Sequence, residues 1–140
     1  MNKVYLIIGS PGSGKTWVCE QAPKTLTYVP HDDYTSESKF VKDLIKGAQT
    51  KDTVGEIPFG LSVIEASLEA AGVKVIPLFI LEKESVISSR YFLREKKIIP
   101  PGHLTRQKTY ATRAKEKGAF TGTSEEVLKQ LTKLVEAENV

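Results

Sequence analysis

The chain of 140 residues contains one cysteine and two histidines, too few side chains for a disulfide framework or a structural zinc site. No apolar run approaches the roughly 20 residues needed to cross a bilayer, and the apolar start is interrupted at Gly9. There is no internal repeat, and neither the net charge of +3 nor the hydrophobic content is that of a disordered chain. We therefore expect one soluble, cytoplasmic domain over residues 1–140, with no membrane partner.

Arginine is also scarce, and its four copies are concentrated in one part of the chain. Arg90, Arg94, Arg106 and Arg113 lie within 24 residues, whereas the sixteen lysines are spread along the sequence. Residues 90–117 carry nine basic side chains and two acidic ones, a local net charge of +7. This concentration predicts that an anionic molecule docks there, although a solvated helix face gives the same pattern.

Apolar runs of strand type alternate with segments of helical periodicity, which is typical of α/β proteins. We expect strands at 4–8, 25–29, 53–57 and 73–81, and helices at 15–21, 36–47, 61–71, 83–95, 103–117 and 124–135. Gly47 and Gly72 are the expected ends of two helices, and Pro77 indicates a bulge or an edge in its strand. The alternation predicts a parallel sheet covered by helices on both faces.

The motif with the most specific chemistry follows the first strand. Residues 9–16 read GSPGSGKT and match G-x-x-x-x-G-K-[ST], in the strand-to-helix context that this motif requires. Its glycines let successive backbone N–H groups surround phosphate oxygens, and the Thr16 hydroxyl is the expected ligand of Mg²⁺. The motif predicts binding of a nucleoside triphosphate. The expected phosphate ligands are Gly12, Ser13, Gly14 and Lys15, with Lys15 at the β- and γ-phosphates.

Two classes of nucleotide-binding protein fit the rest of the sequence poorly. Residues 52–55 read DTVG and match the D-x-x-G of GTPase switches, but no long apolar strand precedes them and no N-K-x-D guanine signature follows. A motor or remodelling ATPase requires an apolar strand that ends in paired acids, and the sequence contains no Asp-Glu dipeptide. A kinase and a nucleotide-binding module without activity remain as hypotheses.

Two acids after the second expected strand favour a kinase. Asp32 and Asp33 follow the carboxyl end of that strand, where doubly wound sheets bind their ligands. A carboxylate beside the γ-phosphate can accept the proton of a hydroxyl acceptor during transfer, whereas a phosphate acceptor does not need one. The alternative role of this pair is helix capping or binding of Mg²⁺-bound water.

Two arginines in the basic segment also fit a kinase. Arg90 and Arg94 are four residues apart, so on a helix they share one face and can both reach the transferring phosphoryl group. Either can instead pair with a nearby glutamate. The Pro-Pro-Gly break after them suits a lid over about residues 90–117 that closes over ATP and excludes water.

Three blocks of residues resemble the kinase domain of the phage-type 5′-hydroxyl polynucleotide kinases. They are residues 7–17, residues 31–34, which read HDDY, and residues 90–104, in the family's order and at similar spacing. The resemblance implies an α/β, single-domain P-loop kinase fold, with a short parallel sheet, helices on both faces and a basic lid. It also implies that Asp32 is the general base and that Arg94 binds the phosphates from the lid.

Together these inferences predict transfer of the γ-phosphate of ATP, with Mg²⁺, to a hydroxyl acceptor. A single-stranded or end-frayed nucleic acid, or a hydroxylated DNA base, is the first candidate acceptor, because Tyr91, Phe92 and Tyr110 are interleaved with basic residues. The same rings can be core residues, and a nucleoside, nucleoside monophosphate or sugar is the alternative acceptor. The family often has an acceptor-binding arginine after the tyrosine at 34, where this chain has Thr35.

Two further places have open roles. Glu56, near the end of a weak strand, is either an acceptor-binding acid or a solvated glutamate. Glu56 and Asp33 are also the next candidates, after Asp32, for the general base or for a metal-binding role. The Gly122–Thr123 turn resembles the purine-contacting loop of nucleoside monophosphate kinases. Residues 123–126, TSEE, have capping-box spacing, so this turn is either an adenine contact or a plain helix cap.

Overall fold

Within residues 2–31, 37–57 and 61–138, which the computed structural model describes, the chain forms five strands and six helices. The strands are β1 (Lys3–Ile8), β2 (Thr27–Val29), β3 (Thr53–Ile57), β4 (Lys74–Ile80) and β5 (Phe120–Gly122). The helices are α1 (Lys15–Gln21), α2 (Glu37–Thr50), α3 (Leu61–Ala70), α4 (Glu84–Glu95), α5 (Pro101–Lys117) and α6 (Ser124–Glu138). None of these described helices is both long and apolar enough to span a membrane.

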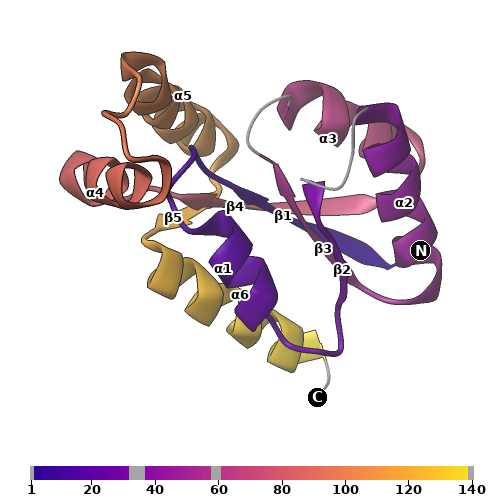
Figure 1. Cartoon of the computed structure of the whole chain (residues 1–140). Helices are drawn as coiled ribbons and strands as arrows, with labels where there is room; N and C mark the ends of the chain where they lie inside the picture. The colour runs from indigo at the N-terminus through magenta and orange to yellow at the C-terminus, as the bar shows by residue number, and fades with distance from the viewer. Residues whose placement is uncertain (1, 32–36, 58–60, 139–140) are drawn as a thin grey trace.

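The five described strands form one parallel sheet in the order β2-β3-β1-β4-β5, with β1 in the centre. Helices α1 and α6 lie on one face of the sheet, and α2, α3 and α5 pack on the other (Figure 1). This arrangement confirms the predicted single-domain α/β fold with a short parallel sheet covered on both faces. All five strands end at one edge of the sheet, which gathers the loops that follow them.

Two hydrophobic clusters, one on each face of the sheet, hold the helices in place. Val4, Leu6 and Ile8 of β1 pack with α2, α3 and α5, whereas Tyr5 and Ile7 pack with α1 and α6. All five side chains are fully buried. Alternate side chains of a strand point to opposite faces, so a central strand covered on both sides is apolar throughout. This requirement explains the unbroken apolar run that begins the sequence.

Gly47 is not the end of a helix, as the sequence pattern predicts, because α2 continues to Thr50. The reason is packing: a Cβ on Gly47 would lie 2.6 Å from Oγ1 of Thr53, which is fully buried on β3. The glycine therefore allows α2 to approach the sheet closely. The expected cap of α2, Ser36, lies outside the described residues.

The other expected boundaries agree better with the structure. Gly72 follows α3 with a φ of +81°, the left-handed conformation of a helix stop. Strand β4 lies between β1 and β5, so the prediction of an edge strand is wrong for the sheet as a whole. Its pairing with β5 begins only at Leu78, so Pro77 has no β5 partner, and its missing N–H is tolerated there. Strand β5 has no counterpart among the expected strands, because three residues carry too little pattern to be recognised.

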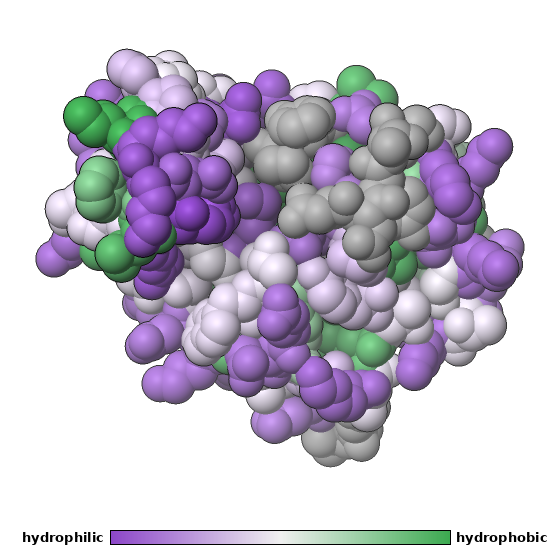
Figure 2. All heavy atoms as spheres, viewed as in Figure 1, coloured by the Kyte–Doolittle hydropathy of each residue, from purple (hydrophilic) through white to green (hydrophobic). Residues whose placement is uncertain are grey.

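The basic segment forms α4, a short connection and α5. Ile87, Tyr91 and Ile99 make a small cluster of their own between α4 and the connection, whereas Tyr110 and Ala114 of α5 belong to a main core cluster. The second half of α5 is thus anchored to the sheet, and the Tyr110 ring is a core residue. Figure 2 shows strongly hydrophilic residues gathered over this end of the molecule, beside a few hydrophobic ones. Exposed hydrophobic side chains here are Phe92, Leu93 and Ile98.

The close approach of α2 to β3 can be tested by adding one methyl group. Gly47→Ala should lower the free energy of unfolding by about 1–3 kcal/mol, because the new Cβ overlaps the buried Thr53 side chain. Urea-induced unfolding, followed by circular dichroism, measures the change. Gly102→Ala in the first turn of α5 is the matched control, since no atom lies within 4 Å of that added Cβ. Equal effects of the two substitutions would contradict the packing explanation.

Candidate functional site

The GSPGSGKT loop connects the central strand β1 to α1. Gly12 and Gly14 have φ values of +85° and +100°, which side chains other than glycine rarely adopt. Within the loop, the N–H of Ser13 donates to the carbonyl of Ser10 at 3.1 Å. A Cβ on Gly14 would also lie 3.0 Å from Cβ of Ser124, at the start of α6. The glycines therefore permit both the turn and the close approach of a distant helix.

Two serine hydroxyls in this loop are buried without a described partner. Ser10 and Ser13 are 1% and 0% exposed, and their Oγ atoms have no hydrogen-bond partner among the described residues. Buried polar groups in folded proteins are nearly always paired, so each such hydroxyl calls for an explanation. Phosphate oxygens bound in the loop would supply acceptors, together with the backbone N–H groups. The loop thus fits the phosphate-binding role predicted for Gly12, Ser13, Gly14 and Lys15.

A buried carboxylate lies directly beside the loop. Glu56, on β3 next to β1, is 2% exposed and has both carboxylate oxygens hydrogen-bonded. The Thr16 hydroxyl donates to Oε2 at 2.6 Å, and the Tyr28 hydroxyl, from β2, donates to Oε1 at 2.5 Å. Burial and this hydrogen bond raise the pKa of the Tyr28 hydroxyl well above its usual value, so it stays protonated as a donor. The interpretation of Glu56 as a solvated glutamate is therefore wrong.

Thr16 and Glu56 fit a magnesium site. A hydroxyl and a carboxylate are the hard oxygen donors that Mg²⁺ prefers, and this ion usually keeps several waters and binds substrate phosphates. Among the described residues no group of three or more His, Cys, Asp or Glu side chains could hold a metal by itself. The protein thus supplies too few ligands to bind the ion by itself, and the two donors suit a magnesium ion whose other ligands are water and nucleotide phosphates.

The expected general base, Asp32, and its neighbour Asp33 lie outside the described residues. The preceding strand β2 ends at Val29 and runs parallel to β3, which runs parallel to β1. The chain after β2 therefore leaves the sheet at the same edge as the GSPGSGKT loop. His31, the last described residue before the acids, packs its ring against Phe40 of α2, with centroids 4.8 Å apart.

Arg90 reaches the loop from α4. Its Nη1 donates to the carbonyl of Ser13 at 3.0 Å, is 3.4 Å from the carbonyl of Gly12, and lies 3.6 Å from Oε1 of Glu82. The same Glu82 oxygen, largely buried, accepts from the backbone N–H and the hydroxyl of Ser124, at 2.9 and 3.1 Å. Glu82 therefore holds both Arg90 and the start of α6 against the loop.

Arg94 does not converge with Arg90. Its Nε donates to Glu95 at 3.1 Å, its guanidinium lies 5.7 Å from the ring centroid of Tyr91, and its side chain is 56% exposed. Both arginines thus pair with glutamates, Arg90 with Glu82 and Arg94 with Glu95, as the alternative prediction has it. Of the expected catalytic arginines, the structure brings Arg90 to the loop and leaves Arg94 on the surface of α4.

The turn before α6 is a capping box. The N–H of Thr123 donates to Oε1 of Glu126 at 2.9 Å, and the N–H of Glu126 donates to the Thr123 hydroxyl at 3.3 Å. These hydrogen bonds lower the pKa of the Glu126 carboxyl. A Cβ on Gly122 would lie 2.9 Å from Cβ of Glu126, which explains the glycine. The predicted cap is confirmed, and the adenine contact of Gly122 and Thr123 stays a prediction.

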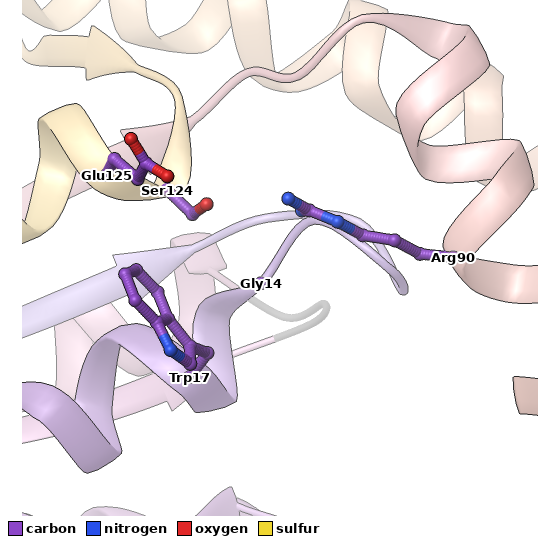
Figure 3. A pocket seen from close by; sticks show the side chains of 5 residues that line it. All are labelled: Gly14, Trp17, Arg90, Ser124 and Glu125. Carbon is purple, nitrogen blue, oxygen red and sulfur yellow. The ribbon is translucent and has the colours of Figure 1, made fainter.

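A cavity of about 340 Å³ opens beside the loop (Figure 3). Its wall brings together the start of α1, the middle of α4 and the start of α6. The lining residues are Gly14, Trp17, Arg90, Ser124 and Glu125. The sequence predicted Gly14 and Arg90 as site residues but gave no site role to the other three, because α1, α4 and α6 are far apart in the chain and only the fold brings them together.

The D-x-x-G match has a structural role only. Oδ1 of Asp52 accepts a hydrogen bond from the N–H of Lys3 at 2.8 Å, at the amino end of β1. The GSPGSGKT loop follows the opposite end of that strand. Asp52 therefore cannot act on a nucleotide bound at the loop, and the GTPase-switch interpretation is wrong.

No protein-family model and no curated protein matches the sequence. Solved structures match over nearly the whole chain. A gluconokinase from Sinorhizobium meliloti 1021 superposes with a TM-score of 0.68 and 16% identity, over 98% of this chain and 95% of its own. A tunicamycin resistance protein from Deinococcus radiodurans superposes with a TM-score of 0.70 and 10% identity, over 96% of each chain.

A de novo designed P-loop fold protein also matches, with a TM-score of 0.56 and 16% identity, over 97% of this chain and 92% of its own. At such identities the likeness shows the fold alone, and one fold supports many activities. The chain has the fold of P-loop kinases. What it does must be argued from the site.

The hydrogen bond from Tyr28 to the buried Glu56 should contribute measurably to stability. Tyr28→Phe removes one donor from a buried carboxylate, so the free energy of unfolding should fall by about 1.5–3 kcal/mol, as measured by urea unfolding. In a Glu56→Ala background the same substitution should have little effect, because the partner is already absent. An equal loss in both backgrounds would show that the tyrosine acts through other contacts.

Proposed function

We propose that this protein is a phosphotransferase that moves the γ-phosphoryl group of ATP, with Mg²⁺, to a hydroxyl acceptor. The observation that carries the proposal is the hydrogen bond between Thr16, in the phosphate-binding motif, and the buried carboxylate of Glu56. When a magnesium–nucleotide complex binds, this buried carboxylate would keep the Thr16 hydroxyl oriented as a ligand of the ion. The P-loop kinase fold of the chain supports the same conclusion.

Each residue then has a distinct task. The loop N–H groups and the ammonium group of Lys15 hold the β- and γ-phosphates, and Glu56 holds the Thr16 hydroxyl in place for the ion. Bound Mg²⁺ would neutralise charge that develops on the phosphate oxygens. Asp32 takes the proton of the acceptor hydroxyl. At the same time the oxygen of that hydroxyl forms a bond to the γ-phosphorus, and the bond between the γ-phosphorus and the leaving ADP oxygen breaks.

The two lid arginines are given different tasks. Arg90 is held at the loop by its contacts with Ser13 and Glu82, so it shapes the nucleotide site from the side. Arg94 has an exposed side chain and reaches the phosphates only when α4 and its connection move, which is the lid motion that we propose. Such closure excludes water and limits wasteful hydrolysis.

A nucleic-acid acceptor is the first candidate. It is supported by the three sequence blocks that resemble the 5′-hydroxyl polynucleotide kinases and by exposed Phe92 beside the exposed Lys96 and Lys97. An exposed ring among cations suits a stacked base. Affinity for such an acceptor should fall with salt, with a slope of about −0.7 per phosphate contacted.

A small-molecule acceptor is the second candidate, and the charge distribution favours it. Part of the basic segment is engaged within the protein: Lys117 pairs with Glu65, and Arg113 donates to the Ser62 hydroxyl at 2.8 Å. Both contacts fasten α5 to α3, and the ion pair of Lys117 leaves less charge for a phosphate backbone. The superposing gluconokinase is named for a small-molecule acceptor, a sugar acid.

Three substitutions test the proposed chemistry. Lys15→Ala should abolish transfer, whereas Asp32→Asn and Arg94→Ala should each lower turnover at least about a hundredfold with little change in ATP affinity. Turnover is measured by release of ADP, and affinity by calorimetry. Near-normal turnover of the Asp32→Asn enzyme would move the general base to another carboxylate, with Asp33 and Glu56 to be substituted next.

The acceptor class is decided by a labelling panel. The protein is incubated with γ-labelled ATP, Mg²⁺ and, separately, a 5′-hydroxyl oligonucleotide, duplex DNA with a hydroxymethylated base, nucleosides, nucleoside monophosphates and sugars. Label on one acceptor class identifies it, and Lys15→Ala protein is the control for contaminating kinase. ATP binding without label on any acceptor would overturn the proposed transfer and favour the nucleotide-binding module without activity.

A further inference from the structure

A second hollow, an apolar groove of about 440 Å³, lies between α4 and the connection that leads to α5. It shares no lining residue with the cavity beside the phosphate-binding loop. Most of its wall is aliphatic or aromatic, and Figure 2 shows hydrophobic residues next to strongly hydrophilic ones at this end of the molecule. The lining residues are Ser88, Ser89, Phe92, Leu93, Ile98 and Ile99.

The groove lies on the side of α4 that faces away from the nucleotide site. Ile87 and Tyr91 are buried, and the carbonyl of Ile87 would lie 3.2 Å from a Cβ added to Gly12, so this side of the helix faces the loop. Phe92 and Leu93 are exposed on other sides of the same helix. A molecule in the groove would therefore leave the phosphate-binding loop accessible.

Exposed apolar side chains gather around this groove. Among the described residues five large hydrophobic side chains are exposed, and three of them, Phe92, Leu93 and Ile98, line the groove with exposures of 52%, 69% and 85%. The other two, Trp17 and Val63, lie on α1 and α3. Single exposed hydrophobic residues are normal, whereas a contiguous group marks an interaction site.

The rim of the groove carries positive charge. Lys96 and Lys97 stand in the connection between the α4 and Ile98 parts of the wall, and both are exposed. Arg94 already pairs with Glu95, whereas no ion pair of Lys96 or Lys97 occurs in the part of the chain that the structure describes. Charge complementarity therefore favours an occupant with acidic groups next to an apolar surface.

The lining discriminates among anionic occupants. A single-stranded nucleic acid uses rings for stacking, but only Phe92 supplies one here, and Leu93 and Ile98 are aliphatic. A lipid surface offers no hydrogen-bond partner at acyl-chain depth to the hydroxyls of Ser88 and Ser89, which also line the groove. A protein segment supplies apolar side chains, polar groups and acids together.

We propose that the groove binds a short amphipathic helix of a partner protein, with apolar side chains in the groove and acidic side chains beside Lys96 and Lys97. The groove follows α4 from Ser88 to Leu93, a length of roughly 8 Å. Two side chains four residues apart on a helix are separated by about 6 Å along its axis, so the groove accommodates two such anchors. This inference does not depend on the proposed phosphotransfer.

A displayed library of random peptides tests which chemistry the groove selects. Peptides of about 15 residues, long enough to form a helix, are selected on the immobilised 140-residue chain. Enriched peptides should share two large apolar residues three or four positions apart, with Asp or Glu beside them. Fluorescence polarisation then measures the affinity of the best peptide. Replacing its acids by lysine should weaken binding at least about tenfold.

Two substitutions place the selected peptide on the groove. Leu93→Asp and Ile98→Asp should each weaken it at least about tenfold, because a charged group replaces an apolar part of the wall. Both side chains are largely exposed, so the fold should be retained, which circular dichroism checks. Val63→Asp is the matched control, since it changes an exposed apolar side chain on α3, outside the groove, and should leave the affinity unchanged.

The charged rim is tested separately. The double variant Lys96→Glu and Lys97→Glu should weaken the selected peptide about tenfold at low salt, and its remaining affinity should no longer fall as salt is added. Lys46→Glu, which reverses an exposed charge on α2, is the control and should have little effect. Equal effects at both places would mean that net charge, and not the rim, attracts the peptide, and the placement of its acids would be overturned.

The other occupants are outcomes of the same experiment. A single-stranded oligonucleotide, vesicles of anionic phospholipid and the mass of the chain in solution by sedimentation are compared with the peptide. Binding of either probe, or dimerisation, that Leu93→Asp and Ile98→Asp abolish, with no shared pattern among the peptides, would assign the groove to that occupant and overturn the proposal. Selected peptides that bind both variants as tightly as wild type would overturn it too. ATP binding and transfer play no part in these outcomes.

Discussion

The site is organised around a carboxylate that is buried at the end of β3. Burial of a charged group is strongly unfavourable unless hydrogen bonds replace the lost water, and here hydroxyl groups from two other elements do so. Glu56 therefore ties Thr16 of α1 and Tyr28 of β2 to the strand between them. The hydrogen bond that satisfies the carboxylate also orients the hydroxyl that a magnesium ion requires, so stability and proposed chemistry depend on one contact.

A second buried carboxylate has the corresponding role on the other flank of the loop. Glu82, just after β4, accepts hydrogen bonds from Ser124 and lies beside the guanidinium of Arg90. Gln107 of α5 completes the arrangement, because its side-chain amide pairs with the backbone N–H and carbonyl of Glu82. Arg90 and Ser124, which line the cavity, are thus positioned by a carboxylate that does not line it, and the loop is held from both neighbours of β1 in the sheet.

The fold leaves the acceptor undetermined. A gluconokinase, a tunicamycin resistance protein and a designed protein all superpose on this chain. Proteins with the same sheet and helices can therefore differ in function. Selection must come from side chains at the open edge of the sheet. In this chain that edge combines the buried carboxylate of Glu56, exposed Trp17 and two arginines that already pair with glutamates.

The sequence alone predicted the parallel sheet, four of its five described strands and the GSPGSGKT loop between the first strand and α1, because periodicity and glycine conformation act over a few residues. It also predicted the capping box at Thr123. It misjudged Gly47 and left Glu56 undecided, since both depend on what packs against them. Thr16 and Glu56 are 40 residues apart, Glu82 and Ser124 are 42 apart, and Arg90 is 77 from Ser13. Only the tertiary structure brings such pairs into contact, because burial and hydrogen bonding between distant segments leave no local pattern.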